Sequence, residues 1–380
     1  MIPVDAGTSE PLPLDAPEGR GSRALVGGVA ERLGWSPRAS PAGAPGWRGP
    51  GGSMLSFEPG GQVEYSSPPF ASVDALLADV RDVVDALAAA ACSRGVLLVT
   101  RGVDPLTPSE AAPLRLTGER YARMARHFEA MGPAGHRMMC QTAAVHVNLD
   151  LGDDPFLRWH LANAMAPVLL ATYANSPVYR GEETGFRSWR AEQWRRLDPQ
   201  RTGVFPLSPD PVDRYLDFAL EAPAFLLGDG RALPFREWLE RGGAGPEDFD
   251  RHLTTLFPEV RPRGYLELRS FDALPPRWYA AVVVPVVGVL HDARATEEAF
   301  ALLPEPTPER LSTSGRAGLR DEATARLARD LFRLGLEGAR RLGERVVGGE
   351  SLEVAEAFFA ELTARGRDPG DSEEAAFATA

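Results

Sequence analysis

Alternating polar and apolar side chains mark the segment 265–269 as a surface that could do chemistry. There, Tyr265, Glu267 and Arg269 alternate with two leucines. Because successive side chains of a strand point to opposite faces, a carboxylate and a guanidinium would share one face above an apolar underside. This arrangement suits the floor of a polar site. It suits equally well a solvent-exposed sheet face that carries an ion pair.

Two other stretches show the same alternation and predict a hairpin and a strand. Residues 53–67 place a Pro-Gly-Gly turn between two alternating runs, which is typical of a hairpin. Residues 137–150 predict a single strand. The polar faces of the three stretches carry the following candidate site residues: Glu58, Gln62, Glu64, Thr142, His146, Asn148, Glu267 and Arg269.

The chemistry that these residue types allow is metal-assisted binding of a phosphate. Carboxylates crowded on one face repel one another unless a cation compensates them, and oxygen ligands without a zinc-type His/Cys set favour Mg²⁺. All 41 basic residues are arginines, because the chain contains no lysine. A phosphate must therefore be held by arginine, backbone N–H groups or a metal ion. An exposed acidic sheet face remains the alternative.

Single residues elsewhere support further hypotheses. Arg187 and Arg190 could clamp a substrate carboxylate, or they could lie on a surface loop. His146 fits a hydrogen-bonded histidine better than a general base, and Cys140 fits a buried hydrophobic residue better than a nucleophile. Cys92 is the only other cysteine, so there is no disulfide framework, which indicates a reducing cytoplasm.

Periodic segments in the rest of the chain predict the elements that position these faces. A helix is expected after Thr117 and a polar loop over 180–203. Because strands and helices mix without a steady βαβ alternation, the sequence predicts an α+β fold, an antiparallel sheet with helices on one side. The predicted helices cover 25–33, 73–93, 155–173, 211–221, 234–241, 246–257 and 276–291, followed by helical segments from 294 to 365.

Length and charge restrict the class of protein. The 380-residue chain has 44% hydrophobic and 25% charged residues, as is usual for a soluble enzyme. Its net charge of −12 argues against nucleic acid or an anionic membrane as the main partner. The longest apolar run, residues 278–290, is too short to span a bilayer. We therefore expect a cytoplasmic protein, a monomer or homodimer, that binds small molecules.

Several motifs in a fixed order resemble one family. The sequence Glu-Pro-Gly-Gly-Gln-x-Glu occurs at 58–64 and Tyr-Leu-Glu-x-Arg at 265–269. Between them lie Met138-Met139 and the segments 174–177, 201–203 and 252–261. In this combination, residues 22–365 resemble glutamate–cysteine ligases of the plant and proteobacterial type, especially the bacterial branch linked to ergothioneine synthesis.

The resemblance implies a fold, a reaction and site roles. The fold would be a glutamine-synthetase-like antiparallel sheet that forms a funnel-shaped active site, with helices on its other face and a helical C-terminal part. The enzyme would use ATP and Mg²⁺ to join the γ-carboxylate of glutamate to the amine of cysteine through an acyl phosphate, on a route to glutathione or ergothioneine. Alternatives are a γ-glutamyl ligase for another amine and a non-catalytic paralogue.

The family motifs also imply a role for each candidate residue. Glu267 and Arg269 would be catalytic, with Arg269 and His146 on the nucleotide side. The metal ligands would be Glu58, Glu64 and Glu267. Substrates would be bound by Gln62, Thr142, Asn148, Arg187, Arg190, Asn175 and Pro177.

One departure from the family concerns the start of the chain. Members open their domain with a strand carrying Gly-x-Glu-x-Glu, and nothing before Glu58 has that form. Residues 1–5 resemble the segment just after that strand. A start codon placed too late explains this better than a lost strand. We therefore expect one catalytic domain over 1–366 that lacks its first strand, followed by a disordered tail over 367–380.

Overall fold

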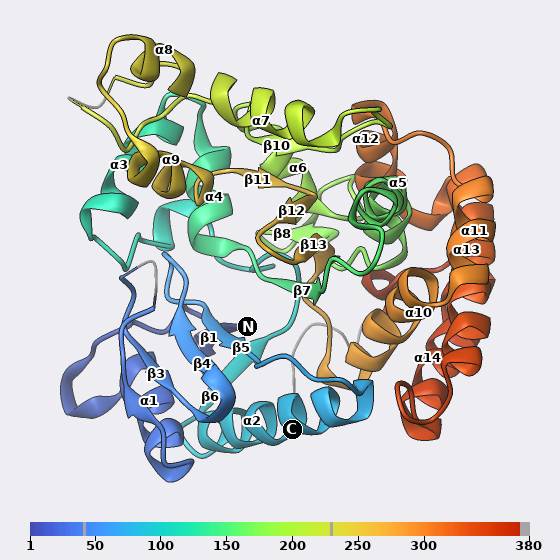
Figure 1. Cartoon of the computed structure of the whole chain (residues 1–380). Helices are drawn as coiled ribbons and strands as arrows, with labels where there is room; N and C mark the ends of the chain where they lie inside the picture. The colour runs from blue at the N-terminus through green and yellow to red at the C-terminus, as the bar shows by residue number, and fades with distance from the viewer. Residues whose placement is uncertain (41–42, 229–230, 373–380) are drawn as a thin grey trace.

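Strands and helices occupy different parts of the chain. The computed structural model describes residues 1–40, 43–228 and 231–372. Most strands come from the first three quarters of the chain, and helices dominate the last quarter (Figure 1). The strands are β1 (Ile2–Asp5), β2 (Ser36–Pro37), β3 (Gly46–Arg48), β4 (Met54–Phe57), β5 (Val63–Ser66), β6 (Val96–Val99), β7 (Ala144–Leu149), β8 (Val178–Tyr179), β9 (Glu182–Glu183), β10 (Thr202–Gly203), β11 (Phe257–Pro258), β12 (Val260–Pro262) and β13 (Leu266–Asp272).

The helices surround these strands and confirm most of the predicted helical segments. The sequence therefore predicted a mixed fold of helices and antiparallel sheets correctly. The helices are α1 (Ser22–Arg32), α2 (Val73–Cys92), α3 (Glu119–Glu129), α4 (Pro133–Gln141), α5 (Pro155–Thr172), α6 (Trp189–Arg195), α7 (Pro211–Glu221), α8 (Phe235–Glu240), α9 (Pro246–Leu253), α10 (Tyr279–His291), α11 (Ala293–Leu302), α12 (Pro308–Ala317), α13 (Glu322–Leu342) and α14 (Gly349–Glu361).

The first sheet contains the predicted hairpin. Its strands lie in the order β2-β3-β4-β5, and every pair is antiparallel. In the central hairpin, Ser56 pairs with Glu64 and Phe57 with Val63. Leu55, Phe57 and Val63 are buried in one hydrophobic core with residues of α1 and α2. The apolar face therefore points into a core, and the polar face is left for other contacts.

The second sheet contains β13, the strand that carries Glu267 and Arg269. Its order is β12-β13-β7, again antiparallel, with β13 in the centre. Glu267 pairs with Arg261 on one side and with Asn148 on the other, so these three side chains share a face. Leu266 and Leu268 are each 1% exposed and lie in the second hydrophobic core. The predicted alternation along this strand is confirmed.

A β-bulge shifts the register near the end of β13. Leu268 pairs with Val147 and Phe271 with Val145, so two residues of β13 lie opposite His146 alone. Leu268 and Phe271 are both buried in the same core although they are three positions apart. The bulge therefore changes which residues of β13 face the core.

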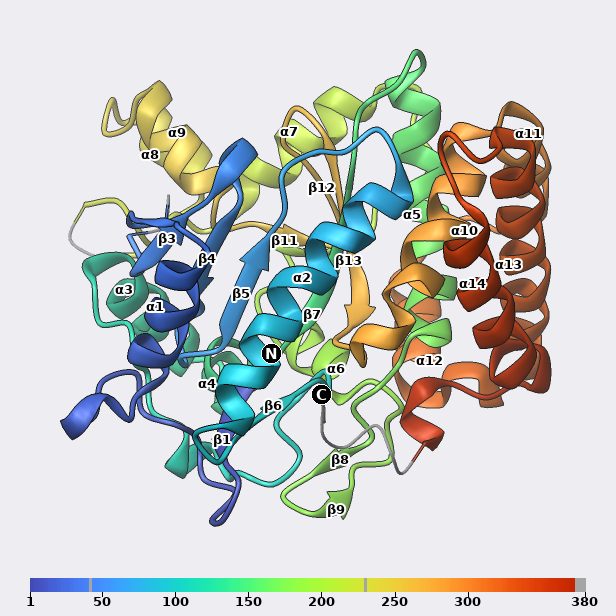
Figure 2. The same ribbon diagram turned by 90° about the horizontal axis from the view of Figure 1, so that it is seen from below.

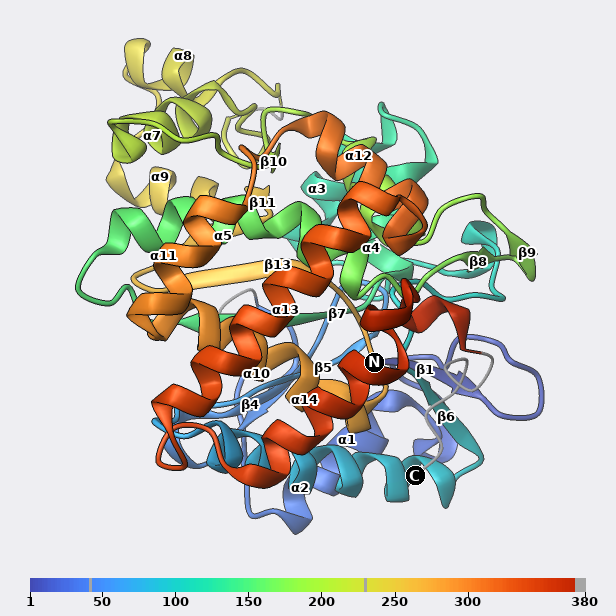
Figure 3. The same cartoon turned by 90° about the vertical axis from the view of Figure 1, so that its right-hand side faces the viewer.

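Helices α5, α10, α13 and α14 cover the apolar face of the second sheet (Figure 3). Two of them, α10 and α13, approach each other at glycines. A Cβ atom on Gly288 would lie only 1.9 Å from the carbonyl oxygen of Gly335, so a larger residue would force the helices apart. In the part of the chain that the structure describes, none of the helices combines the length and apolarity needed to cross a lipid bilayer.

Helix α2 connects the two cores. It runs below both sheets, as Figure 2 shows. Ser72 caps its first turn, because the Ser72 side chain accepts a hydrogen bond from the Ala75 N–H at 3.5 Å. At one end, Val73 belongs to the core under the second sheet, whereas Val83 and Leu87 belong to the core under the hairpin. The helix thereby fixes the two sheets relative to each other.

The prediction of one strand over 137–150 is wrong for its first part. The chain is helical in α4 as far as Gln141, and only Ala144–Leu149 form a strand. Gly132, with a φ of 83°, and Pro133 at the first turn start the helix. Short segments in which apolar residues are adjacent fit a helical and a strand period equally well, so the alternation did not settle the structure.

Three smaller predictions also need correction. The segment 180–203 is not only a loop, because it contains α6, which Ser188 caps by accepting from the Ala191 N–H at 3.1 Å. The helix expected after Thr117 exists as α3, but its N-cap is Gly118, which has no side chain to cap with. The strands also form several separate sheets instead of one.

The segment 367–372, which composition assigned to a disordered tail, is ordered and attached to the body of the protein. Arg187 Nε donates to an Asp368 carboxylate oxygen at 2.9 Å, and Arg187 Nη2 contacts Asp371 at 2.7 Å. Both Arg187 and Asp368 are almost fully buried. We call this arrangement the C-terminal clasp. Residues 373–380 lie outside the described residues.

Candidate active site

The turn of the hairpin β4–β5 presents two glutamates. Glu64 accepts a hydrogen bond from the Ser56 hydroxyl at 3.0 Å across the strand pair. Glu58 lies where the turn begins, and its backbone N–H donates to the Gln62 carbonyl at 2.9 Å. The pKa of Glu58 is raised to about 7, first by desolvation and then by repulsion from Glu64. The hairpin therefore holds excess negative charge.

Gln62 fastens this turn to the neighbouring chain. Its Nε2 donates to the carbonyl oxygens of Met139 and Thr142, at 3.2 and 3.0 Å, and its Oε1 accepts from the Gly60 N–H at 2.9 Å. The Thr142 hydroxyl donates to the Met138 carbonyl at 2.6 Å. The side chains of Gln62 and Thr142, both expected to bind substrate, are thus engaged in internal hydrogen bonds that place the hairpin beside β7.

On the second sheet, two arginines and a histidine surround Glu267. Its carboxylate contacts Arg261 Nε at 2.5 Å, Arg269 Nη1 at 3.4 Å and His146 Nδ1 at 3.6 Å. Burial alone would raise the pKa of Glu267, but Arg269, His146 and Arg261 outweigh it and hold that pKa well below its usual range. Asn148 is exposed on the same face. Glu267 is therefore a permanent carboxylate, compensated from within the protein.

Arg269 is held between charged and aromatic neighbours. Its guanidinium lies 5.5 Å from the ring centre of Trp194 and 5.8 Å from that of Phe257. Burial, followed by repulsion from Arg261, lowers its pKa to about 10, so it stays protonated at neutral pH. Burial and Arg269 lower the pKa of His146 to about 4, which leaves that imidazole neutral.

The two sheets bring these groups into one electrostatic neighbourhood. Arg269, Arg120 and Arg261 all act against the raised pKa of Glu58. We call Glu58, Glu64, Arg261, Glu267 and Arg269 the acid–arginine site.

Two residues near this site did not follow from the motifs. Arg261 could have been found from the sequence, because Arg261 and Glu267 are equidistant from the turn at Gly264, which has a φ of 77°. Arg120 comes from α3, and no local pattern indicates which way that helix faces.

Four residues that were predicted to bind substrate are instead buried in internal contacts. Arg190 Nη2 donates to the Arg269 carbonyl at 2.8 Å, and its Nη1 lies 3.5 Å from Asp272. The Asn175 N–H donates to Asp272 at 2.8 Å, and its side-chain amide donates to two backbone carbonyls. Pro177 is buried nearby, and Arg187 belongs to the C-terminal clasp. Arg190 and Asn175 therefore hold the end of β13, and Arg187 and Arg190 have different carboxylate partners.

The carboxylates of the acid–arginine site are the candidate metal ligands. In residues 1–40, 43–228 and 231–372, no three His, Cys, Asp or Glu side chains come together closely enough to hold a metal ion. Glu58 and Glu64 offer oxygen atoms in a place where negative charge is in excess, which fits a hard cation. The Glu267 carboxylate is already bound by arginine. Of the three predicted metal ligands, Glu58 and Glu64 are therefore free to bind a cation, whereas Glu267 is bound by arginine.

Comparison with known proteins agrees with the motifs. Residues 17–357 match the model of glutamate–cysteine ligase family 2 (GCS2). Glutamate–cysteine ligase EgtA of Mycolicibacterium smegmatis is 39% identical over 312 residues, which cover 76% of this chain and 72% of the relative. EgtA of Mycobacterium tuberculosis strain H37Rv is 36% identical over 323 residues, or 79% and 72% of the two chains.

A plant protein extends the similarity. The chloroplastic glutamate–cysteine ligase of Nicotiana tabacum is 30% identical over 351 residues, covering 85% of this chain and 67% of the relative. The family suggested by the Glu-Pro-Gly-Gly-Gln-x-Glu and Tyr-Leu-Glu-x-Arg motifs is thus confirmed by bacterial and plant relatives alike. The chain belongs to the glutamate–cysteine ligase family 2.

Proposed function

We propose that this protein joins the γ-carboxylate of L-glutamate to the amine of L-cysteine, using ATP and passing through an acyl phosphate. The observation that carries the proposal is the acid–arginine site of a family member, where the hairpin β4–β5 brings Glu58 within electrostatic reach of Arg269 on β13. Carboxylates and a desolvated guanidinium are the groups that phosphoryl transfer from ATP to a carboxylate requires.

Glu58 and Glu64 would hold Mg²⁺. Bound there, the ion would screen the negative charges of the nucleotide and the carboxylate. Glu267 has a different part, because its carboxylate is held by Arg261. We assign Glu267 the role of fixing Arg261 and Arg269, with a direct contact to the metal as the alternative that the family motif implies.

Arg269 would bind a phosphate oxygen. Its position over Trp194 and its contact with Glu267 fix the guanidinium before any ligand arrives, which favours electrostatic stabilisation of developing charge. His146 is neutral at pH 7 and can exchange hydrogen bonds with the nucleotide without adding charge. The exposed amide of Asn148 lies on the same face and can contact the substrate.

We further infer that the two antiparallel sheets form the glutamine-synthetase-like funnel of a single catalytic domain. The course of α2 through both hydrophobic cores supports one domain. Both cysteines are free thiols, which supports a cytoplasmic location with ATP, glutamate and cysteine as the small-molecule ligands.

The direct test is a reaction of the purified protein with glutamate, cysteine, ATP and Mg²⁺. We expect ADP and γ-glutamylcysteine in equal amounts, and omission of cysteine or Mg²⁺ should reduce both. A panel of other amines separates the cysteine ligase from a γ-glutamyl ligase of different acceptor preference. If no acceptor yields ADP, and ATP with Mg²⁺ does not raise the melting temperature, the protein is a non-catalytic paralogue and the proposal fails.

A further inference from the structure

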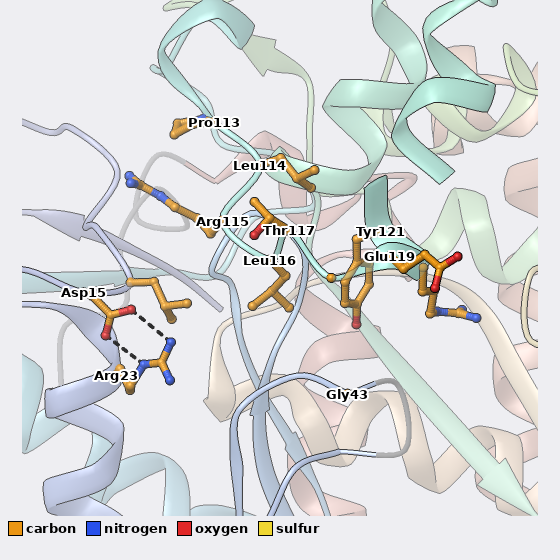
Figure 4. Close-up of a pocket in the computed structure, with 13 residues that line it drawn as sticks. Asp15, Arg23, Gly43, Pro113, Leu114, Arg115, Leu116, Thr117, Glu119 and Tyr121 are labelled. Carbon is orange, nitrogen blue, oxygen red and sulfur yellow. Dashed lines mark hydrogen bonds and ion pairs between the residues drawn. The ribbon is translucent and has the colours of Figure 1, made fainter. Parts of the chain in front are cut away.

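A cavity of about 720 Å³ is lined by residues 113–121, which are hydrogen-bonded to the turn that follows Glu58. Figure 4 shows Arg115 at one end and Tyr121 at the other, with Leu116 and Thr117 between them. The charge of Glu58 acts on the Tyr121 hydroxyl and, after burial, helps to raise its pKa to about 12. The volume falls within the range of about 300–1,000 Å³ that small-molecule sites occupy.

The wall of the cavity is tied to the turn that presents Glu58. The backbone N–H groups of Arg115 and Leu116 both donate to the Pro59 carbonyl, at 2.7 and 3.1 Å. The stem of Arg115 packs on Gly61, where an added Cβ atom would lie 3.4 Å from its Cγ atom. The cavity and the glutamates therefore have a fixed relative position.

Three arginines line this cavity: Arg120 is bonded to Thr254, and Arg23 and Arg115 differ in their charge balance. Arg23 is paired with Asp15 at 2.8 Å, so its charge is compensated. Arg115 has no carboxylate within ion-pair distance among the described residues, and its one side-chain hydrogen bond is a long one of 3.5 Å to the Pro11 carbonyl. The Nε atom of Arg115 is buried and, over the same residues, has no hydrogen-bond partner.

An incompletely bonded guanidinium is costly to keep partly buried beside a cavity. Its planar donors match the two oxygen atoms of a carboxylate or the oxygens of a phosphate, and an oxyanion would supply both the missing charge and the missing acceptors. The apolar side chains of Leu14, Leu114 and Leu116, which also line the cavity, would contact the uncharged part of the same ligand.

We propose that this cavity is a substrate subsite in which Arg115 binds an oxyanion, either a carboxylate of one of the amino acids or a phosphate of the nucleotide. The identity of the ligand rests on the proposed ligase function. The presence of an oxyanion subsite rests on the cavity and on Arg115 alone.

The experiment compares two arginine variants of the same cavity. Arg115→Gln removes the uncompensated charge, whereas Arg23→Gln removes a charge that Asp15 already balances. Binding of glutamate, of cysteine and of ATP with Mg²⁺ is measured by calorimetry on each full-length variant. We expect Arg115→Gln to weaken one of the three ligands roughly 10- to 100-fold, Arg115→Lys to recover part of the loss, and Arg23→Gln to bind like the wild type.

The ligand that loses affinity identifies the source of the oxyanion, and the KM for that substrate should rise with kcat nearly unchanged. Circular dichroism and the melting temperature check that Arg115→Gln is folded. If a folded Arg115→Gln protein binds all three ligands normally, or if Arg23→Gln causes an equal loss, the subsite proposal is overturned. If the wild type makes no product but the two variants still differ in binding, the ligase proposal fails and the oxyanion subsite stands.

Discussion

The hairpin β4–β5 and the strand β13 both supply glutamates to the acid–arginine site, but they balance the charge in opposite ways. Glu267 is enclosed by Arg261, Arg269 and His146, and its pKa is held well below the usual range. The pKa of Glu58 is raised to about 7, first by desolvation and then by repulsion from Glu64, and Arg269, Arg120 and Arg261 offset this only in part. One carboxylate is part of the folded structure, and the other needs a cation from outside.

This difference separates stability from function within one site. A buried charge whose partners are fixed side chains stabilises the fold as long as all partners remain, and removing one leaves the others uncompensated. A carboxylate in like-charged surroundings costs stability until a ligand arrives. Substitutions of the glutamates on the hairpin β4–β5 and on β13 should therefore have opposite effects on the unfolding free energy, even where both reduce activity.

The largest effect is expected from Glu267→Gln. The variant leaves Arg261 and Arg269 without their common carboxylate, which should lower the unfolding free energy by about 3 kcal/mol. Misplacement of Arg269 should also reduce the rate at which ADP is formed roughly 100- to 1,000-fold. Denaturant titration and a coupled ADP assay measure the two losses. Glu182→Gln, on the exposed strand β9, is the control, and an unchanged melting temperature for Glu267→Gln would contradict the structural role.

Glu58→Gln should separate the two effects. Activity should fall at least about 100-fold, because a proposed metal ligand is lost. Stability without Mg²⁺ should be unchanged or higher at pH 8, because repulsion from Glu64 disappears. Calorimetric Mg²⁺ titration and thermal unfolding test this pair of outcomes. A clear loss of stability would mean that Glu58, like Glu267, is compensated within the protein.

A pH series gives a smaller effect whose sign follows from the raised pKa of Glu58. Between its ordinary pKa of 4.5 and the folded pKa of about 7, the folded state binds a proton that the unfolded state has released. The contribution of Glu58 to stability is therefore complete below pH 4.5 and is lost as the pH rises to 7. The unfolding free energy of the metal-free wild type, minus that of Glu58→Gln, should show this decline. A difference that rises over the same interval would refute the assignment.

Ser56→Ala should have the smallest effect. It removes the hydrogen bond to Glu64, worth about 1 kcal/mol, and leaves that carboxylate freer to move. The affinity for Mg²⁺ should fall by less than about tenfold. Ser66→Ala, on the same polar face of the hairpin but exposed to solvent, is the control. Equal results for both serines would show that Glu64 does not depend on Ser56 for its position.

The sequence predicted those parts of the site that depend on local periodicity. The faces of the hairpin and of β13 follow from alternation, because burial of one face fixes the other. The directions of Arg187 and Arg190 could not be predicted in this way. Their partners, Asp368 and Asp272, lie far along the chain, so a surface-loop arginine and a buried one have the same local sequence.

The same limit explains the misassigned elements. The start of α4 depends on Gly132 and Pro133, and also on the close packing of Gly135 against Phe128, where an added Cβ atom would lie 2.2 Å from the Phe128 Cβ atom. Such a contact between two helices leaves no periodic trace in either one. The family motifs filled part of this gap, because they carry information about position in the fold that alternation does not.

The bulge of β13 has a consequence for how this strand can change over evolutionary time. Up to Leu268 the strand presents odd-numbered residues to the acid–arginine site, and after the bulge Asp272 takes the polar face while Phe271 takes the core. Deleting Ser270 would remove the bulge and restore regular alternation, so that Phe271 would stay in the core and Asp272 would stay beside the hydroxyls of Ser176 and Ser188. The extra residue can therefore be lost from β13 without moving the residues that follow it to the other face.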